Sequence, residues 1–220
     1  MTENTDTRTT AVDAGPAATP SRVVLLGPPG AGKGTQAALL AERLGVPAIS
    51  TGDIFRANKA AGTELGREAQ RYMDAGEYVP DDVTNRMVAD RLAQADASAG
   101  FLLDGYPRTT AQVRTLDEVL AARGTGLDAV LEITADVDVV VDRLLKRASE
   151  QGRSDDTEDV VRRRLEVYAE QTAPLAAAYA ARGLLVTVDG VGAVEEVSQR
   201  VAAALRAAGG DASSAAAAGA

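Results

Sequence analysis

Five short runs of aliphatic residues punctuate the chain, each about the length of one β-strand. They are Arg22–Leu26, Val46–Ile49, Phe101–Asp104, Ala129–Ile133 and Leu184–Val188. Because apolar residues follow one another in these runs with little polar alternation, the runs predict strands that are buried on both faces, as in a parallel sheet.

Between these runs, apolar residues recur at helical spacing. The predicted helices are Lys33–Leu44, Ala111–Ala122, Asp136–Ala148, Asp156–Ala181 and Ala193–Ala207, with about three more over 53–93, broken at Gly62 and at Val79–Pro80. Strands that alternate with helices predict an α/β fold, a five-stranded parallel sheet with helices on both faces. Ligands of such folds bind at the carboxyl ends of the strands.

The two ends of the chain differ in composition from the rest. Residues 1–20 are polar and lack the apolar segment of a secretory signal, and residues 209–220 are rich in Ala, Gly and Ser. Both compositions predict disordered extensions around one domain at 21–208. No apolar run approaches the roughly 20 residues that a membrane-spanning helix needs, so we expect no membrane partner.

The amino-acid composition excludes several kinds of catalytic and metal-binding site. The 220 residues include no Cys and no His, which excludes disulfides, thiolate zinc sites and a Ser-His-Asp triad. A net charge of −9 argues against nucleic acid as a partner, although a small anion could bind if the cations gather in one cleft. Any catalysis must come from Lys, Arg, Asp, Glu and the backbone.

A glycine-rich loop follows the first predicted strand. The segment from Gly27 to Lys33 matches the phosphate-loop pattern G-x-x-x-x-G-K, and it opens a helix as that pattern requires. Glycines let successive amides point into one concavity, and the Lys reaches the outer phosphates. The residue after Lys33 is Gly34, with Thr35 one position later, so the usual hydroxyl ligand of Mg²⁺ is missing or displaced.

Three motifs together indicate the protein family more specifically than the phosphate loop does alone. The loop with Gly34–Thr35, the segment Ser50–Arg56 and the segment Gly100–Arg108 resemble the signatures of nucleoside monophosphate kinases, the adenylate kinase family in particular. The similarity runs from about Val23 to Val201. It implies a small NMP-binding lobe near 50–79, a short lid near 146–156, and reversible phosphoryl transfer from Mg-ATP to AMP that yields two ADP.

The second anion site rests on two arginines near strand ends. Either Arg56 or Arg108 alone could form a surface ion pair, but both stand at motif positions suited to holding a phosphate. The resemblance implies that Thr51 and Gln112 accompany adenine, although Thr51 could instead cap a helix, because Ser50-x-x-Asp53 is also a capping box. The AMP residues implied are Thr51, Arg56, Glu77, Tyr78, Val79, Gly105, Tyr106, Pro107, Arg108, Gln112, Arg153 and Arg164.

A cluster of arginines surrounds residue 150. A solvated helix face with i,i+4 pairs explains Arg162 and Arg163. The resemblance instead makes Arg143, Arg147, Arg153 and Arg164 phosphate ligands, with Asp155 and Asp156 on the lid. The residues implied for ATP binding are Gly30, Ala31, Gly32, Lys33, Gly34, Thr35, Arg143, Arg147 and Gly192. The residues implied for catalysis are Lys33, Arg108, Arg143, Arg153 and Arg164.

Asp104 is the last residue of the third predicted strand. The resemblance makes Asp104 the acid that orients hydrated Mg²⁺, and the short lid without Cys implies no zinc. The resemblance also implies a monomer in purine nucleotide homeostasis and biosynthesis, with ATP, AMP and ADP as its small-molecule partners, and we expect the protein in the cytoplasm. A UMP/CMP kinase and a catalytically silent nucleotide-binding module are the alternatives.

Overall fold

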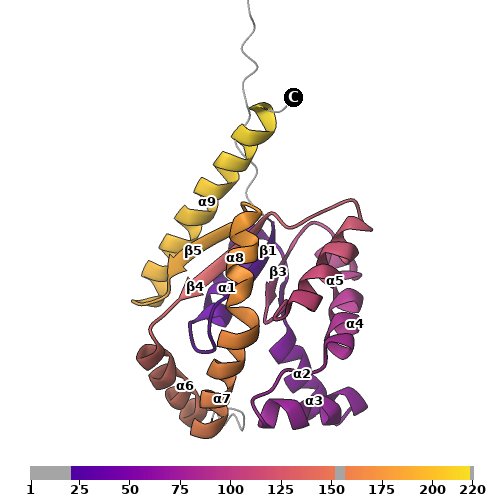
Figure 1. Cartoon of the computed structure of the whole chain (residues 1–220), viewed down its shortest axis with the longest axis vertical. Helices are drawn as coiled ribbons and strands as arrows, with labels where there is room; N and C mark the ends of the chain where they lie inside the picture. The colour runs from indigo at the N-terminus through magenta and orange to yellow at the C-terminus, as the bar shows by residue number, and fades with distance from the viewer. Residues whose placement is uncertain (1–20, 152–156, 219–220) are drawn as a thin grey trace, which may run out of the picture.

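A parallel sheet of five strands forms the centre of the computed structural model, which describes residues 21–151 and 157–218 (Figure 1). The strands are β1 (Arg22–Leu26), β2 (Ala48–Ser50), β3 (Phe101–Asp104), β4 (Ala129–Thr134) and β5 (Leu185–Asp189). Their order across the sheet is β2-β3-β1-β4-β5, and Leu25 of β1 pairs with Asp104 of β3. The predicted α/β class is confirmed.

Side chains of successive strand residues point to opposite faces, and both faces are covered by helices. Val24 and Leu26 belong to the core on one side, whereas Val23 and Leu25 belong to the core on the other. The first side is covered by α4 (Asp81–Leu92), α5 (Thr110–Ala121) and α8 (Pro174–Ala181), and the second by α1 (Lys33–Leu44) and α9 (Val194–Ala218).

A small lobe is built from α2 (Thr51–Ala60) and α3 (Glu64–Asp74), which lie together at the end of the molecule away from the described termini (Figure 1). Its own core contains Phe55, Ala69, Val79 and Val83. The two helices approach closely at Gly66, where a Cβ atom would clash with the backbone carbonyl group of Asn58.

The segment predicted as one helix over Asp156–Ala181 is interrupted, so that prediction was wrong. It forms α7 (Glu158–Val167), a π-helical turn (Tyr168–Thr172) and α8. Within the turn, the amide of Ala173 donates to the carbonyl of Tyr168, five residues earlier, at 2.9 Å. Pro174 has no amide hydrogen to continue the α-helical ladder, which explains why the regular helix breaks here.

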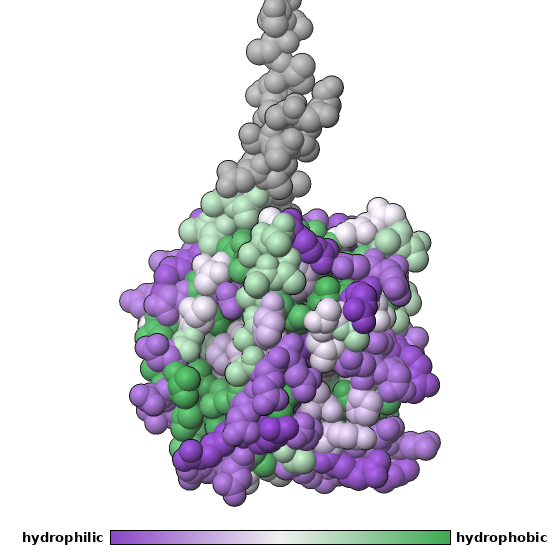
Figure 2. All heavy atoms as spheres, viewed as in Figure 1, coloured by the Kyte–Doolittle hydropathy of each residue, from purple (hydrophilic) through white to green (hydrophobic). Residues whose placement is uncertain are grey.

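A second pair of helices, α6 (Val137–Gln151) and α7, shares a core of Val140, Leu144 and Val161. The predicted lid spans their junction, and its residues 152–156 lie outside the described part of the chain. On the face shown in Figure 2, hydrophilic side chains predominate over α7, α2 and α3, whereas apolar ones gather over α6.

The structure describes residues at the C-terminal end of the chain but not at the N-terminal end. The predicted N-terminal extension, residues 1–20, lies outside the described residues. The structure continues α9 to Ala218, over most of the segment whose composition predicts a disordered tail. Alanine is the strongest helix former, which favours helix after Asp211. No helix in the described ranges combines the length and the apolar character needed to cross a membrane.

Candidate active site

A pocket of about 740 Å³ lies at the carboxyl ends of β1 and β3. The chain leaves β1 toward one edge of the sheet and leaves β3 toward the other, so the pocket occupies the topological switch point. Every described residue assigned above from the resemblance lines this pocket except Tyr106. Arg153, Asp155 and Asp156 lie outside the described residues.

Tyr106 is placed differently from the prediction. Its side chain is only 1% exposed and belongs to the core beneath the pocket. The hydroxyl donates to Oδ1 of Asn85 at 2.8 Å, and burial raises the pKa of this phenol. Tyr106 therefore supports the loop between Gly105 and Arg108 from below.

The phosphate loop has the geometry that its glycines predict. Gly30 has φ +86°, and a Cβ atom there would lie 2.8 Å from the carbonyl oxygen of Val140. Gly32 ends the loop with φ +97°, and α1 begins at Lys33 without a side-chain cap. The first-turn amides of α1 therefore remain available to an anion in the pocket.

Lys33 folds back over its own loop. Its Nζ donates to the carbonyl oxygens of Gly27, at 2.7 Å, and Pro28, at 2.8 Å. Burial lowers the pKa of Lys33 to about 8; Asp104 acts against this shift, whereas the positive charge of Arg108 adds to it. The lysine is thus partly neutral just above physiological pH until a negative ligand arrives.

This pKa predicts a pH-dependent affinity for ATP. If the phosphates of ATP bind the charged amine, as the resemblance implies, binding above pH 8 must take up a proton, and the Kd for ATP should then rise about tenfold from pH 7 to pH 9. Titration calorimetry at several pH values measures this slope. Lys33→Arg is the control, because a guanidinium stays charged and should give a flat profile. Equal slopes in both proteins would refute the assignment to Lys33.

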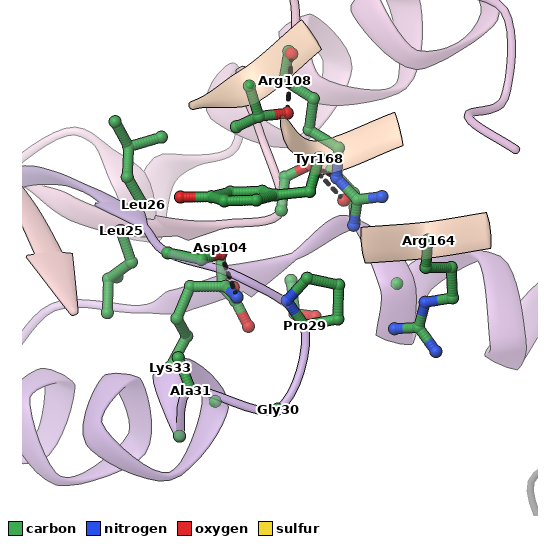
Figure 3. Close-up of a pocket in the computed structure, with 18 of the residues that line it drawn as sticks. Leu25, Leu26, Pro29, Gly30, Ala31, Lys33, Asp104, Arg108, Arg164 and Tyr168 are labelled. Atoms are coloured by element: carbon green, nitrogen blue, oxygen red, sulfur yellow. Dashed lines mark hydrogen bonds between the residues drawn. The ribbon is translucent and has the colours of Figure 1, made fainter. Parts of the chain in front are cut away.

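Two further arginines lie on the other side of the pocket. Arg56 forms an ion pair with Asp53 at 2.6 Å, and both side chains line the cavity. Arg108 donates through Nε to the carbonyl of Gly105 at 2.8 Å, and its guanidinium lies 4.8 Å from the centre of the Tyr78 ring. Figure 3 shows Arg108 and Arg164 reaching toward the cavity from different parts of the chain.

Thr51 is not the helix cap that the capping-box interpretation allowed. Ser50 caps α2, because its hydroxyl accepts from the amide of Asp53 at 3.2 Å. Thr51 is 2% exposed and donates to the carbonyl of Gly105 at 2.9 Å. A Cβ atom at Gly105 would lie 2.7 Å from the Thr51 hydroxyl, so this close approach requires glycine.

The arginines of α6 and α7 approach the phosphate loop from outside. Arg143 donates to the carbonyl of Gly190 at 3.0 Å and, at 3.4 Å, to that of Ala31 in the loop. Arg147 and Arg164 also line the cavity. Gly192, in the turn after β5, also lines the pocket.

Contacts between distant segments were missed by the sequence analysis. The sequence indicated a solvated ion-paired face for Arg162 and Arg163; Arg162 does pair with Glu158 at 2.7 Å. Arg163 instead reaches across to Glu77 of the small lobe at 2.7 Å, besides pairing with Glu166.

The hydroxyl of Thr172, presented by the π-helical turn, forms a second contact of this kind. It donates to the carbonyl of Arg108 at 2.9 Å and lies 2.8 Å from the hydroxyl of Tyr78. Thr172 is buried although it is polar, and both of its partners lie far from it in the sequence. Pro174 was the one sequence signal that could have located the turn.

Asp104 stands at the end of β3 beside the phosphate loop. Its Oδ2 would lie 3.7 Å from a Cβ atom placed on Gly34. Within 21–151 and 157–218, no group of three or more acidic, His or Cys side chains could hold a metal alone. One carboxylate fits Mg²⁺, which usually keeps several waters and takes its other ligands from substrate phosphates.

A phosphate loop at the switch point of a parallel sheet, faced across one pocket by a second group of cations, is the arrangement of a P-loop nucleotide kinase. The adenylate kinase family model matches residues 25–184. The chain is 66% identical to the adenylate kinase of Kocuria rhizophila and 60% identical to that of Thermobifida fusca, each over 185 residues, 84% of this chain and 98% of the relative. With the adenylate kinase of Pseudarthrobacter chlorophenolicus, identity is 60% over 86% of this chain and 98% of the relative. The chain belongs to the adenylate kinase family.

Proposed function

We propose that this protein transfers the γ-phosphoryl group of Mg-ATP reversibly to AMP, giving two ADP. The observation that carries the proposal is the shared pocket, lined on one side by the phosphate loop and on the other by Thr51, Arg56, Arg108 and Gln112. Two nucleotides can thus meet with their phosphates between two groups of cations.

The donor nucleotide is assigned to the phosphate loop. Backbone amides from Gly30 to Thr35 surround its β- and γ-phosphates, and Lys33 exchanges its two carbonyl partners for phosphate oxygens. Gly192 backs the adenine of ATP. Arg143 and Arg147 approach the phosphates from α6.

The acceptor is assigned to the small lobe. Arg56 and Arg108 hold the phosphate of AMP, and the backbone at Glu77, Tyr78 and Val79 closes over the nucleotide. The attacking atom is a phosphate oxygen that is already ionised near pH 7, so the reaction needs no general base. This chemistry suits a chain without His.

Catalysis is then alignment together with charge stabilisation. Arg143, Arg153 and Arg164 stabilise the negative charge on the phosphoryl group in transfer. Asp104 would hold Mg²⁺ through its waters, and the bound ion would supply positive charge that offsets the charge of the ATP phosphates. All these residues come from one chain, so the proposal requires no second copy, and we assign the reaction to the cytoplasm, where ATP and AMP are abundant.

The acceptor preference tests this proposal. ADP formation from Mg-ATP is measured with AMP, CMP, UMP and GMP in parallel, and Lys33→Ala, purified identically, gives the background from host enzymes. We expect rapid turnover with AMP and at most a few per cent of that rate with the other acceptors, because Thr51 and Gln112 are suited to adenine.

Each other outcome has a distinct meaning. A preference for CMP or UMP would keep the phosphate sites and reject the base assignment. Binding of ATP without turnover on any acceptor would make the protein a nucleotide-binding module.

A further inference from the structure

The amide of Gln112 is held at both ends. Gln112 is 1% exposed, yet it borders the pocket. Its Oε1 accepts from the backbone amide of Arg108 at 2.7 Å, and its Nε2 donates to Oδ1 of Asp81 at 2.7 Å. Asp81 is itself fixed, because its Oδ2 accepts from the hydroxyl of Thr109 at 2.8 Å.

These partners permit only one orientation of the amide. A backbone N–H can only donate and a carboxylate only accepts, so Oε1 must face Arg108 and Nε2 must face Asp81. Rotating the amide by 180° would place Oε1 against the carboxylate and an N–H against an N–H. Two good hydrogen bonds would become two repulsive contacts in a buried place, where such losses are large.

We propose that Asp81 is a positioning residue that sets the base specificity of the acceptor site by fixing the orientation of the Gln112 amide. This inference rests on the proposed function, in which Gln112 faces the base of AMP. After its contacts within the protein, the amide has one Nε2 hydrogen and one Oε1 lone pair left for a nucleotide.

The two purine edges call for opposite orientations. Adenine presents an acceptor at N1 beside a donor at its 6-amino group. Hypoxanthine and guanine present a donor at N1 beside an acceptor at O6. An amide free to rotate could pair with either edge, whereas a locked amide matches one and leaves mismatched polar groups with the other.

The inosine nucleotide IMP tests most directly whether the orientation of the Gln112 amide is fixed. IMP differs from AMP only at the 6-position and in the proton on N1, so its phosphate and sugar contacts are unchanged. In Asp81→Asn, the new amide can donate to a rotated Gln112, and only Arg108 still opposes the rotation. We expect the ratio of kcat/KM for AMP to that for IMP to fall at least tenfold, with the KM for ATP unchanged.

Asp82→Asn is the matched control. It removes the same charge one residue away, from a side chain that is 76% exposed and lies 3.8 Å from Arg86 on the same helix. The ratio should stay within twofold in this variant. Asn keeps the size of Asp and is also tolerated at a helix start, and a thermal melt of each variant checks that the fold is intact.

A second variant separates the possible failures. If Gln112→Asn lowers the AMP to IMP ratio and Asp81→Asn does not, the positioning role of Asp81 is refuted and the proposed function stands. If neither variant changes the ratio, Gln112 does not read the base, and the inference fails although the enzyme still phosphorylates AMP. If the wild type does not phosphorylate AMP, the proposed function fails.

Discussion

Arg164→Ala is expected to lower kcat for ADP formation about 10³-fold, a cost of about 4 kcal/mol in transition-state stabilisation. Arg164 lies on α7 and borders the pocket, near enough to the phosphate loop for its positive charge to lower the pKa of Lys33. We expect a cation there to stabilise a charged phosphoryl group in transfer more than it stabilises either bound nucleotide. Steady-state rates at saturating ATP and AMP measure the effect.

Arg162→Ala is the control for this prediction. Arg162 lies on the same helix, its side chain is 70% exposed, and it pairs with Glu158 one turn away. Its loss should change kcat less than twofold, since exposed pairs of this kind contribute little. A decrease of less than tenfold in Arg164→Ala would remove Arg164 from the catalytic residues.

Gly66→Ala is expected to destabilise the protein by about 3 kcal/mol, although alanine normally stabilises a helix by about 1 kcal/mol relative to glycine. The added Cβ would clash with the backbone of Asn58, so α2 and α3 must move apart. For a domain of this size, the melting temperature should fall by about 10 °C. Calorimetry or thermal circular dichroism measures it.

Gly126→Ala provides the comparison. Nothing lies within 4 Å of a Cβ at Gly126, and its backbone is not in the left-handed region. The substitution should be neutral or slightly stabilising, because it restricts the unfolded chain. Equal melting temperatures for Gly66→Ala and the wild type would show that the two helices do not pack as described.

Most strands could be predicted from the sequence because buried parallel strands need continuous aliphatic runs. The boundary at Val46 was two residues early: β2 begins at Ala48. Pro47 has no amide to donate, and only its carbonyl joins the ladder, accepting from Leu102 at 2.9 Å. The break near Thr172 was missed because a π turn leaves no periodicity that differs clearly from an α-helix.

The candidate site likewise has parts that could be predicted from the sequence and parts that could not. The phosphate loop could be predicted because one local segment contains its glycines and its lysine. Asp81 and Thr172 could not, because their importance arises from partners about 30 to 90 residues away, Gln112 and Tyr78. Nor does the spacing of charges reveal that Arg163 pairs with Glu77, since the same spacing predicts a pair with Glu166 on its own helix.

The contacts of Glu77 and Tyr78 have a thermodynamic consequence. The loop that contains Glu77 and Tyr78 is joined to α7 by the ion pair of Glu77 with Arg163 and to the π-helical turn by the contact of Tyr78 with the Thr172 hydroxyl. A nucleotide that moves one of these segments must either lengthen these contacts or move the other segment with it. We therefore expect the binding free energies of ATP and AMP to be coupled through these two contacts, in which case each nucleotide changes the affinity of the other by the same factor.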